Sequence, residues 1–141
     1  MSIEMYAFIR EADIPDRGTW QESINTLGFP LVLDKDLDPL KSTGFTPCKI
    51  SGIASGFEIY LDSADDILDS YPERRSEFSE FEKSISFRWG GHVEELACSM
   101  ASAAALVKRH NAKVYLPDDN LVYDLDSLIQ TAREVIDSIA R

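Results

Sequence analysis

Hydrophobic residues in this chain repeat with a period of two in some segments and with the spacing of a helix in others. The first pattern is typical of a β-strand with one buried face, and the second is typical of an amphipathic helix. The alternating or short apolar segments predict strands at residues 3–10, 31–33, 45–53, 57–61, 85–89, 114–116 and 121–123. Helical spacing predicts helices at residues 20–27, 64–70, 93–110 and 125–139.

Polar residues predict where several of these elements start and stop. Thr19 and Glu22 have the spacing of a capping box, in which each side chain accepts a hydrogen bond from the other residue's main-chain amide. Gly28 and Asn111 are residue types that tolerate the left-handed conformation in which helices commonly end. Asp124 is expected to cap the last helix.

Two connecting segments are less regular. Residues 52–56 contain two glycines and predict the link between the third and fourth strands. Residues 73–83 carry Phe78 and Phe81 at a spacing that fits either a helical pair or the lip of a strand, and the pattern leaves both interpretations open.

The order of the elements predicts the fold class. Strands and helices follow one another as β-α-β-β-β-α-β-α-β-β-α, with no internal repeat or linker. Residues 1–141 are therefore expected to form a single α+β domain with a mixed, mostly antiparallel sheet and helices packed on it. Residues 3–10 are apolar on both faces, which places this strand inside the sheet. The alanine-rich helix at 93–110 is expected to lie against the centre of the sheet, because small side chains allow a close approach.

The net charge of −11 is concentrated in two segments. Residues 58–82 contain nine acidic residues against Arg74 and Arg75, and residues 118–126 contain four acidic residues and no basic one. These segments account for the whole net charge, because acids and bases balance in the rest of the chain. A field of one sign attracts basic partners and repels nucleic acids and anionic lipids, so we expect a basic protein partner, no nucleic acid and no membrane.

The cysteines and the hydropathy pattern bear on the compartment. Cys48 and Cys98 have neither a CxxC spacing nor a histidine pair nearby. The N-terminal residues carry acids where a secretion signal has basic and apolar residues, and the apolar stretch at 97–107 is too short to span a bilayer. We therefore expect a cytoplasmic protein with two buried, reduced thiols, and one disulfide between them remains the open alternative.

One segment has the composition of a ligand site, where a strand ends and a helix begins. Main-chain amides at the start of a helix attract anions, and an arginine and a histidine there would add positive charge. One hypothesis is therefore a site for an anionic small molecule, or an enzyme active site, at residues 88–92. Its candidate residues are Arg88, Gly90, Gly91 and His92.

The competing interpretation of this segment is a tight turn in which His92 or Gly91 caps the helix. Glu94 and Glu95 lie in the first helical turn, where they repel an added anion. The chain also lacks the spacings of phosphate loops, zinc sites and calcium loops. We therefore expect no metal and no cofactor, and a protein that is not an enzyme.

The acidic run at residues 58–82 is the main candidate for a binding surface. Tyr60, Tyr71, Phe78 and Phe81 interleave with the acids, and aromatic residues among charges of one sign are typical of surfaces that bind a basic protein. A solvated face that only adds solubility is the competing interpretation. The carboxylates assigned to the partner-binding surface are Asp65, Asp66, Asp69, Glu73, Glu77 and Glu80.

Residues 85–132, which begin ISFRWGG, resemble the C-terminal part of small uncharacterised bacterial proteins. In those proteins a strand ending in WGG leads into an alanine-rich helix, a hairpin and a final helix; the resemblance implies no catalytic residues. As a short, acidic, cysteine-poor chain, the protein is also similar to immunity proteins that neutralise bacterial toxins. That similarity implies that carboxylates of residues 58–82 face the basic active site of a nuclease toxin.

A homo-oligomer is a further possibility. In this alternative the alanine-rich helix or the C-terminal helix packs across an interface between copies of the chain.

Overall fold

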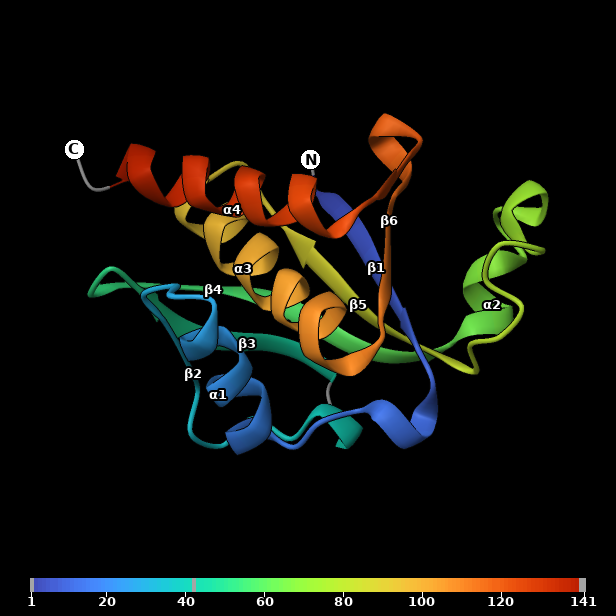
Figure 1. Cartoon of the computed structure of the whole chain (residues 1–141), viewed down its shortest axis with the longest axis horizontal. Coiled ribbons are helices and arrows are strands. Elements are labelled where there is room, and N and C mark those ends of the chain that lie inside the picture. Colours follow the sequence, from blue (N-terminus) through green and yellow to red (C-terminus); the bar gives the residue numbers. More distant parts are fainter. Residues whose placement is uncertain (1, 42, 140–141) are drawn as a thin grey trace.

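The computed structural model describes residues 2–41 and 43–139, which form one seven-stranded sheet and four α-helices (Figure 1). The strand order is β2-β3-β4-β5-β1-β6-β7, and all pairings between these strands are antiparallel. The predicted α+β class with a mostly antiparallel sheet is confirmed. The strands are β1 (Ile3–Ile9), β2 (Leu31–Leu33), β3 (Thr43–Ile50), β4 (Ile53–Ser63), β5 (Lys83–Trp89), β6 (Lys113–Leu116) and β7 (Leu121–Tyr123). The helices are α1 (Arg17–Thr26), α2 (Ala64–Leu68), α3 (Val93–His110) and α4 (Leu125–Ile139).

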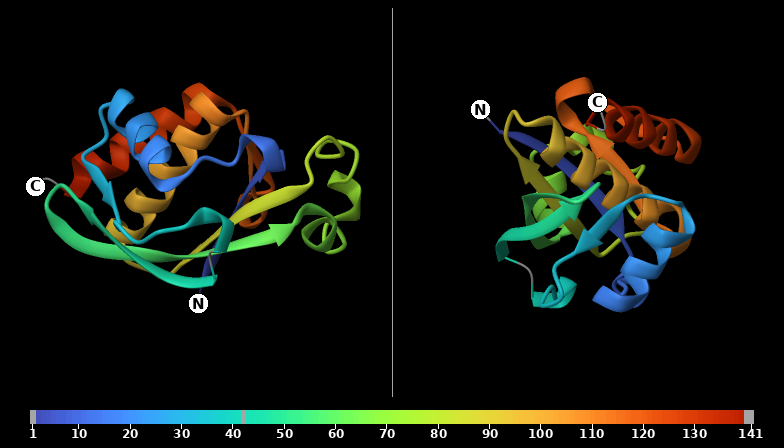
Figure 2. Two further views of the ribbon diagram at one scale, coloured as in Figure 1. Left: turned by 90° about the horizontal axis from the view of Figure 1, so that it is seen from below. Right: turned by 90° about the vertical axis from the view of Figure 1, so that its left-hand side faces the viewer.

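Helices α1, α3 and α4 cover one face of the sheet, and the main core lies between this layer and the strands (Figures 1 and 2). β1 lies inside the sheet between β5 and β6, as its two apolar faces predicted. α3 lies between α1 and α4 and contacts five strands. All residues of its stretch Ala97–Leu106 are buried, so the predicted close packing of small side chains on the sheet is confirmed.

The burial of α3 bears on the homo-oligomer alternative. Its alanine-rich stretch is enclosed by α1, α4 and the sheet of its own chain, and the Trp20 indole Nε1 donates a hydrogen bond to the Ser102 carbonyl at 3.0 Å. This stretch therefore has no surface left for a second copy.

The start of α1 differs from the prediction. The helix begins at Arg17, and the carboxylate of Asp16 accepts a hydrogen bond from the Thr19 amide at 2.8 Å. The capping box of Thr19 and Glu22 is thus wrong, because an aspartate three residues upstream already supplies the acceptor. The end of α1 is as predicted, since Gly28 follows it with a φ of 78°.

The connection between β3 and β4 is also shorter than predicted. Ser51 and Gly52 have φ values of 51° and 79°, and Ile50 pairs with Ile53 across them. Two successive residues with positive φ match the twist of a two-residue hairpin turn. The link predicted at residues 52–56 is therefore wrong, because all but the first of those residues belong to β4.

Residues 73–82 form neither a helical pair nor a strand, and Lys83, the last residue of the segment considered, begins β5. A 3-10 turn at Pro72–Arg74 is followed by further turns until β5 begins at Lys83. Phe78 and Phe81 are nevertheless buried.

None of the helices in the described part of the chain has the length and hydrophobicity needed to cross a bilayer.

Candidate functional site

Residues 64–82, called the acidic excursion below, connect β4 to β5 and contain most of the acidic run. They begin with α2, and the Ala64 amide donates a hydrogen bond to the Glu82 carbonyl at 2.9 Å, which closes the base of the excursion. Figure 1 shows the excursion at one end of the molecule, apart from the layer of α1, α3 and α4. Ser63 holds the N-cap position of α2, but its hydroxyl makes no capping hydrogen bond.

The acidic excursion packs on the sheet face opposite to α3. Met5, Ala7 and Ile9 of β1 belong to the main core, whereas Tyr6 and Phe8 belong to a second cluster. Because successive side chains of a strand point to opposite faces, this second cluster lies on the other side of the sheet. Its buried members are Tyr6, Phe8, Ala64, Leu68, Phe78, Phe81 and Tyr115.

The aromatic residues of the acidic excursion are therefore its core. Phe78 is fully buried and stacks on Phe8 of β1 with ring centroids 4.3 Å apart. Tyr71 contacts Tyr115 of β6 edge to face at 5.4 Å. The interpretation of Phe78 and Phe81 as exposed anchors for a partner is wrong, because both side chains are used to hold the excursion on the sheet.

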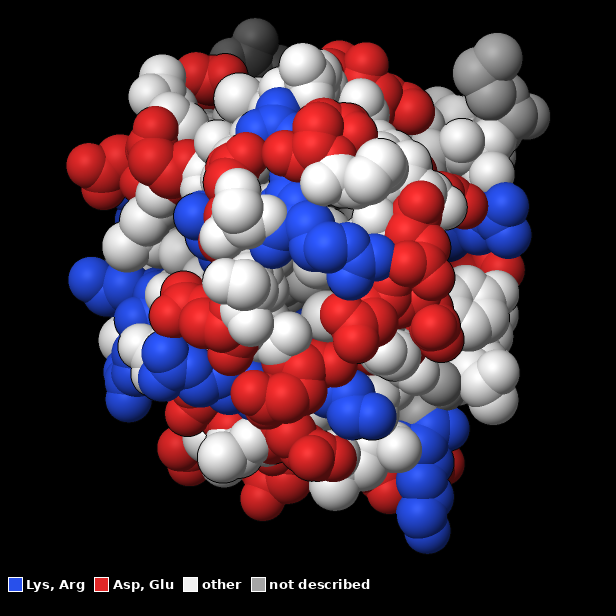
Figure 3. Space-filling model, turned by 90° about the vertical axis from the view of Figure 1, so that its right-hand side faces the viewer, with Lys and Arg blue, Asp and Glu red and all other residues white. Residues whose placement is uncertain are grey.

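The six predicted carboxylates all lie on the exposed outside of the acidic excursion, so the structure brings them onto one segment. Arg75 forms ion pairs with Asp65, at 3.1 Å, and with Asp69. Two further pairs join Arg74 to Glu77, at 2.7 Å, and Arg10 of the β1 end to Glu80, at 2.8 Å. These arginines offset part of the negative charge, and Figure 3 shows acidic and basic side chains interspersed at this end of the molecule.

Two of the six carboxylates remain without such a partner. Within residues 2–41 and 43–139, Asp66 and Glu73 form no ion pair, and both are exposed. Of the six, these are the carboxylates whose charge is free to act on another molecule.

Arg74 connects the acidic excursion to the second acidic segment of the chain. Its Nη2 donates hydrogen bonds to the side-chain oxygen of Asn120, at 2.6 Å, and to the Asn120 carbonyl, at 3.2 Å. Asn120 lies in the turn between β6 and β7, next to the exposed Asp118 and Asp119. We call the joint set of carboxylates the acidic surface: Asp65, Asp66, Asp69, Glu73, Glu77, Glu80, Asp118 and Asp119.

The sequence does not indicate this connection. Arg74 and Asn120 are 46 residues apart and belong to no recognisable motif. The only signal in the sequence is that both segments are acidic, and charge alone does not show that they are neighbours.

The structure does not bring the candidate residues of the alternative site at 88–92 together. Arg88 points to the sheet face opposite α3, where its Nη2 forms an ion pair with Glu4 at 3.2 Å. The same Glu4 accepts a hydrogen bond from the Tyr6 hydroxyl at 2.8 Å. Burial and this hydrogen bond raise the pKa of Tyr6 well above its usual value.

His92 instead lies at the N-cap of α3, as the competing interpretation predicted, and Gly90 and Gly91 form the turn before it. The Glu95 carboxylate accepts a hydrogen bond from the His92 amide at 3.3 Å and so occupies one of the amides that an anion would use.

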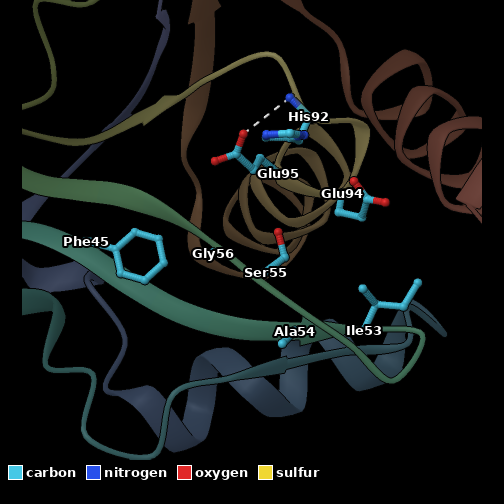
Figure 4. A pocket seen from close by; sticks show the side chains of 8 residues that line it. All are labelled: Phe45, Ile53, Ala54, Ser55, Gly56, His92, Glu94 and Glu95. Atoms are coloured by element: carbon cyan, nitrogen blue, oxygen red, sulfur yellow. Dashed lines mark hydrogen bonds between the residues drawn. The ribbon is translucent and has the colours of Figure 1, made fainter.

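A cavity of about 470 Å³ adjoins His92, between the start of α3 and the first part of β4 (Figure 4). Glu94 and Glu95 line it, and in the described part of the chain no lysine or arginine does. Two carboxylates disfavour an anionic ligand here. Among described residues, no cluster of histidine, cysteine or acidic side chains could hold a metal ion.

Comparison with known proteins found no matching family model, no matching curated protein and no matching solved structure.

Proposed function

We propose that this chain is a non-enzymatic protein-binding module whose acidic surface binds a basic protein. The observation that carries the proposal is the pair of hydrogen bonds from Arg74 to Asn120, because they unite two separate acidic segments into one surface. Basic proteins approach such a field faster than neutral ones, and complementary charge then selects among partners.

Rigid support of the acidic surface favours binding over mere solubility. A solvated acidic loop needs no core of its own, yet the acidic excursion buries Phe78 completely and Phe81 almost so. Carboxylates on a supported segment lose little conformational entropy when a partner binds, which improves affinity.

The arginines of the acidic excursion further sharpen this proposal. Arg75 is held between Asp65 and Asp69, and Arg74 is held by Glu77 and Asn120. Such pairs fix the positions of these carboxylates. Among the described residues, the carboxylates of the acidic surface that form no ion pair are Asp66, Glu73, Asp118 and Asp119, and their charge is the most available to a basic partner.

The biological role that we propose is neutralisation of a toxin in the bacterial cytoplasm. An immunity protein that blocks a nuclease must cover a basic active site, and exposed carboxylates supply the charge for that contact. A role of this kind needs no cofactor, no metal and no nucleic-acid contact from the chain itself.

Affinity capture tests the proposal. The tagged chain is incubated with lysate of the source cells at low and at high salt, and bound proteins are identified by mass spectrometry. We expect a basic protein that elutes as ionic strength rises, since screening weakens contacts between exposed charges. Coexpression then tests the toxin role. If the captured protein is a toxin, it should stop the growth of cells that express it, and coexpression of this chain should restore growth. A salt-insensitive partner would contradict the proposed use of the acidic surface.

A further inference from the structure

Cys48 and Cys98 meet across the interface between the sheet and the helix layer. Cys48 lies in β3, Cys98 lies in the middle of α3, and their Sγ atoms are 2.7 Å apart with both thiols free. The S–S bond of a disulfide is about 2.05 Å long, so the sulfur atoms must approach by only about 0.7 Å to bond.

We infer that Cys48 and Cys98 are a disulfide-forming pair, which a small disulfide oxidant of the glutathione class converts into an intramolecular bond between β3 and α3. The inference is independent of the proposed function, since the pair lies in the main core and not in the acidic excursion.

The two thiols differ in solvent access, which sets the order in which they react with the oxidant. Cys98 is 0% exposed, whereas Cys48 is 5% exposed and lines a surface cavity of about 350 Å³. That cavity is basic, although the chain as a whole is acidic, and so it attracts an anionic oxidant such as glutathione disulfide. Its charged lining residues are Arg17, Asp34, Lys35 and Lys49.

The reaction is a double thiol–disulfide exchange. The Cys48 thiol loses its proton, and its sulfur attacks one sulfur of glutathione disulfide; the S–S bond of the oxidant breaks and the first glutathione leaves as a thiolate. The Cys98 thiol then loses its proton and attacks Sγ of Cys48, which expels the second glutathione. The two protons pass to the two glutathione thiolates, so two protein thiols are oxidised and one glutathione disulfide is reduced.

The environment of Cys48 makes the first step slow. Its hydrogen bond with Cys98 and its burial raise the pKa of the Cys48 thiol above the ordinary value. Only a thiolate attacks a disulfide, so we expect oxidation over hours and not seconds.

Incubation of the full chain with glutathione disulfide tests the inference. We expect the intact mass to fall by two hydrogens, titratable thiols to fall from two to none, and the melting temperature to rise by about 5–15 °C, because a cross-link over a long loop restricts the unfolded chain. Reduction should reverse all three changes.

Two variants distinguish the order of attack. Cys98→Ala fits among the alanines of α3, and we expect it to stop at a mixed disulfide in which Cys48 carries one glutathione. Cys48→Ala should stay unmodified while folded, because Cys98 has no exposed surface. The Lys35→Glu/Lys49→Glu variant should react more slowly with glutathione disulfide but not with the uncharged hydroxyethyl disulfide.

Three results would overturn the inference. The first is a folded chain that keeps both thiols while the urea-unfolded chain is oxidised. The second is a product in which each cysteine carries its own glutathione. The third is modification of Cys98 in folded Cys48→Ala at the rate seen for Cys48.

Discussion

The Arg74 guanidinium lies 2.6 Å from the side-chain oxygen of Asn120, a residue 46 positions further along the chain. The same guanidinium pairs with Glu77 at 2.7 Å and lies over the Tyr115 ring at 5.0 Å. Arg74 is thus fixed from three sides, and its position sets the relative placement of the two acidic segments.

Replacement of this arginine should release the turn between β6 and β7. We expect Arg74→Ala to lower the urea midpoint slightly, because it removes partly exposed charged hydrogen bonds, and to speed amide exchange in residues 118–123. Urea denaturation and hydrogen exchange measure the two effects. The control is Arg133→Ala, since the hydrogen bond that Arg133 makes among the described residues is a weak 3.4 Å contact with the Leu27 carbonyl. Equal exchange in both variants would contradict the linking role.

The stability of the second cluster, which holds the acidic excursion on the sheet, should depend on Phe78. We expect Phe78→Ala to destabilise the protein by about 3–5 kcal/mol, because it removes a buried ring and leaves a cavity against Phe8. Phe45→Ala is the matched control, since that ring is 64% exposed. A similar urea midpoint for both variants would show that the acidic excursion is not held by its aromatic core.

A glycine in β4 is required by close packing. A Cβ on Gly56 would contact the Phe45 ring and come within 2.5 Å of the Thr46 carbonyl oxygen. We expect Gly56→Ala to cost about 1–3 kcal/mol and the additional Phe45→Ala substitution to restore only part of it, because the carbonyl belongs to the backbone of β3. Gly91→Ala is the control, since a Cβ there meets no atom within 4 Å; equal thermal stability of the two alanine variants would contradict this account.

Stability should fall with acidification through His110. Burial and the neighbouring Arg109 lower the pKa of His110 in the folded chain below 6.5, and Ser23 hydrogen-bonds its ring at 2.8 Å. The unfolded chain therefore binds more protons just below pH 6.5, so stability rises with pH in that window and is lost as pH falls.

We expect His110→Gln to reduce the difference between the urea midpoints at pH 5 and pH 7.5, because its side chain is uncharged at both. The His92→Gln control changes the exposed histidine at the other end of α3. An unchanged pH dependence in His110→Gln would contradict the assignment.

Local signals in the sequence predicted the elements that depend on neighbouring residues. Asn111 has a φ of 58° after α3, and Asp124 accepts a hydrogen bond from the Ser127 amide at 2.8 Å before α4, as expected. The sequence did not predict the turn at Ser51 and Gly52 correctly, because serine seldom adopts positive φ and only Gly52 marked the position.

The acidic surface depends on contacts between segments that are far apart in the sequence. The periodicity of hydrophobic residues carries no information about such contacts. Phe78 and Phe81 are spaced like residues of a helix, but their burial comes from strands far away in the sequence. All six carboxylates are exposed, whereas their arginine partners, apart from Arg74 beside Glu77, are set by the tertiary fold.

If the proposed function is right, position on the acidic surface, and not total charge, decides partner binding. The measurement compares capture of the basic partner by the native chain, by Asp66→Lys/Glu73→Lys and by Glu22→Lys/Asp36→Lys, which raises the net charge equally on exposed positions outside the acidic surface. We predict that the first variant loses the partner and the second retains it. Equal capture by all three chains, or equal loss in both variants, would contradict the account.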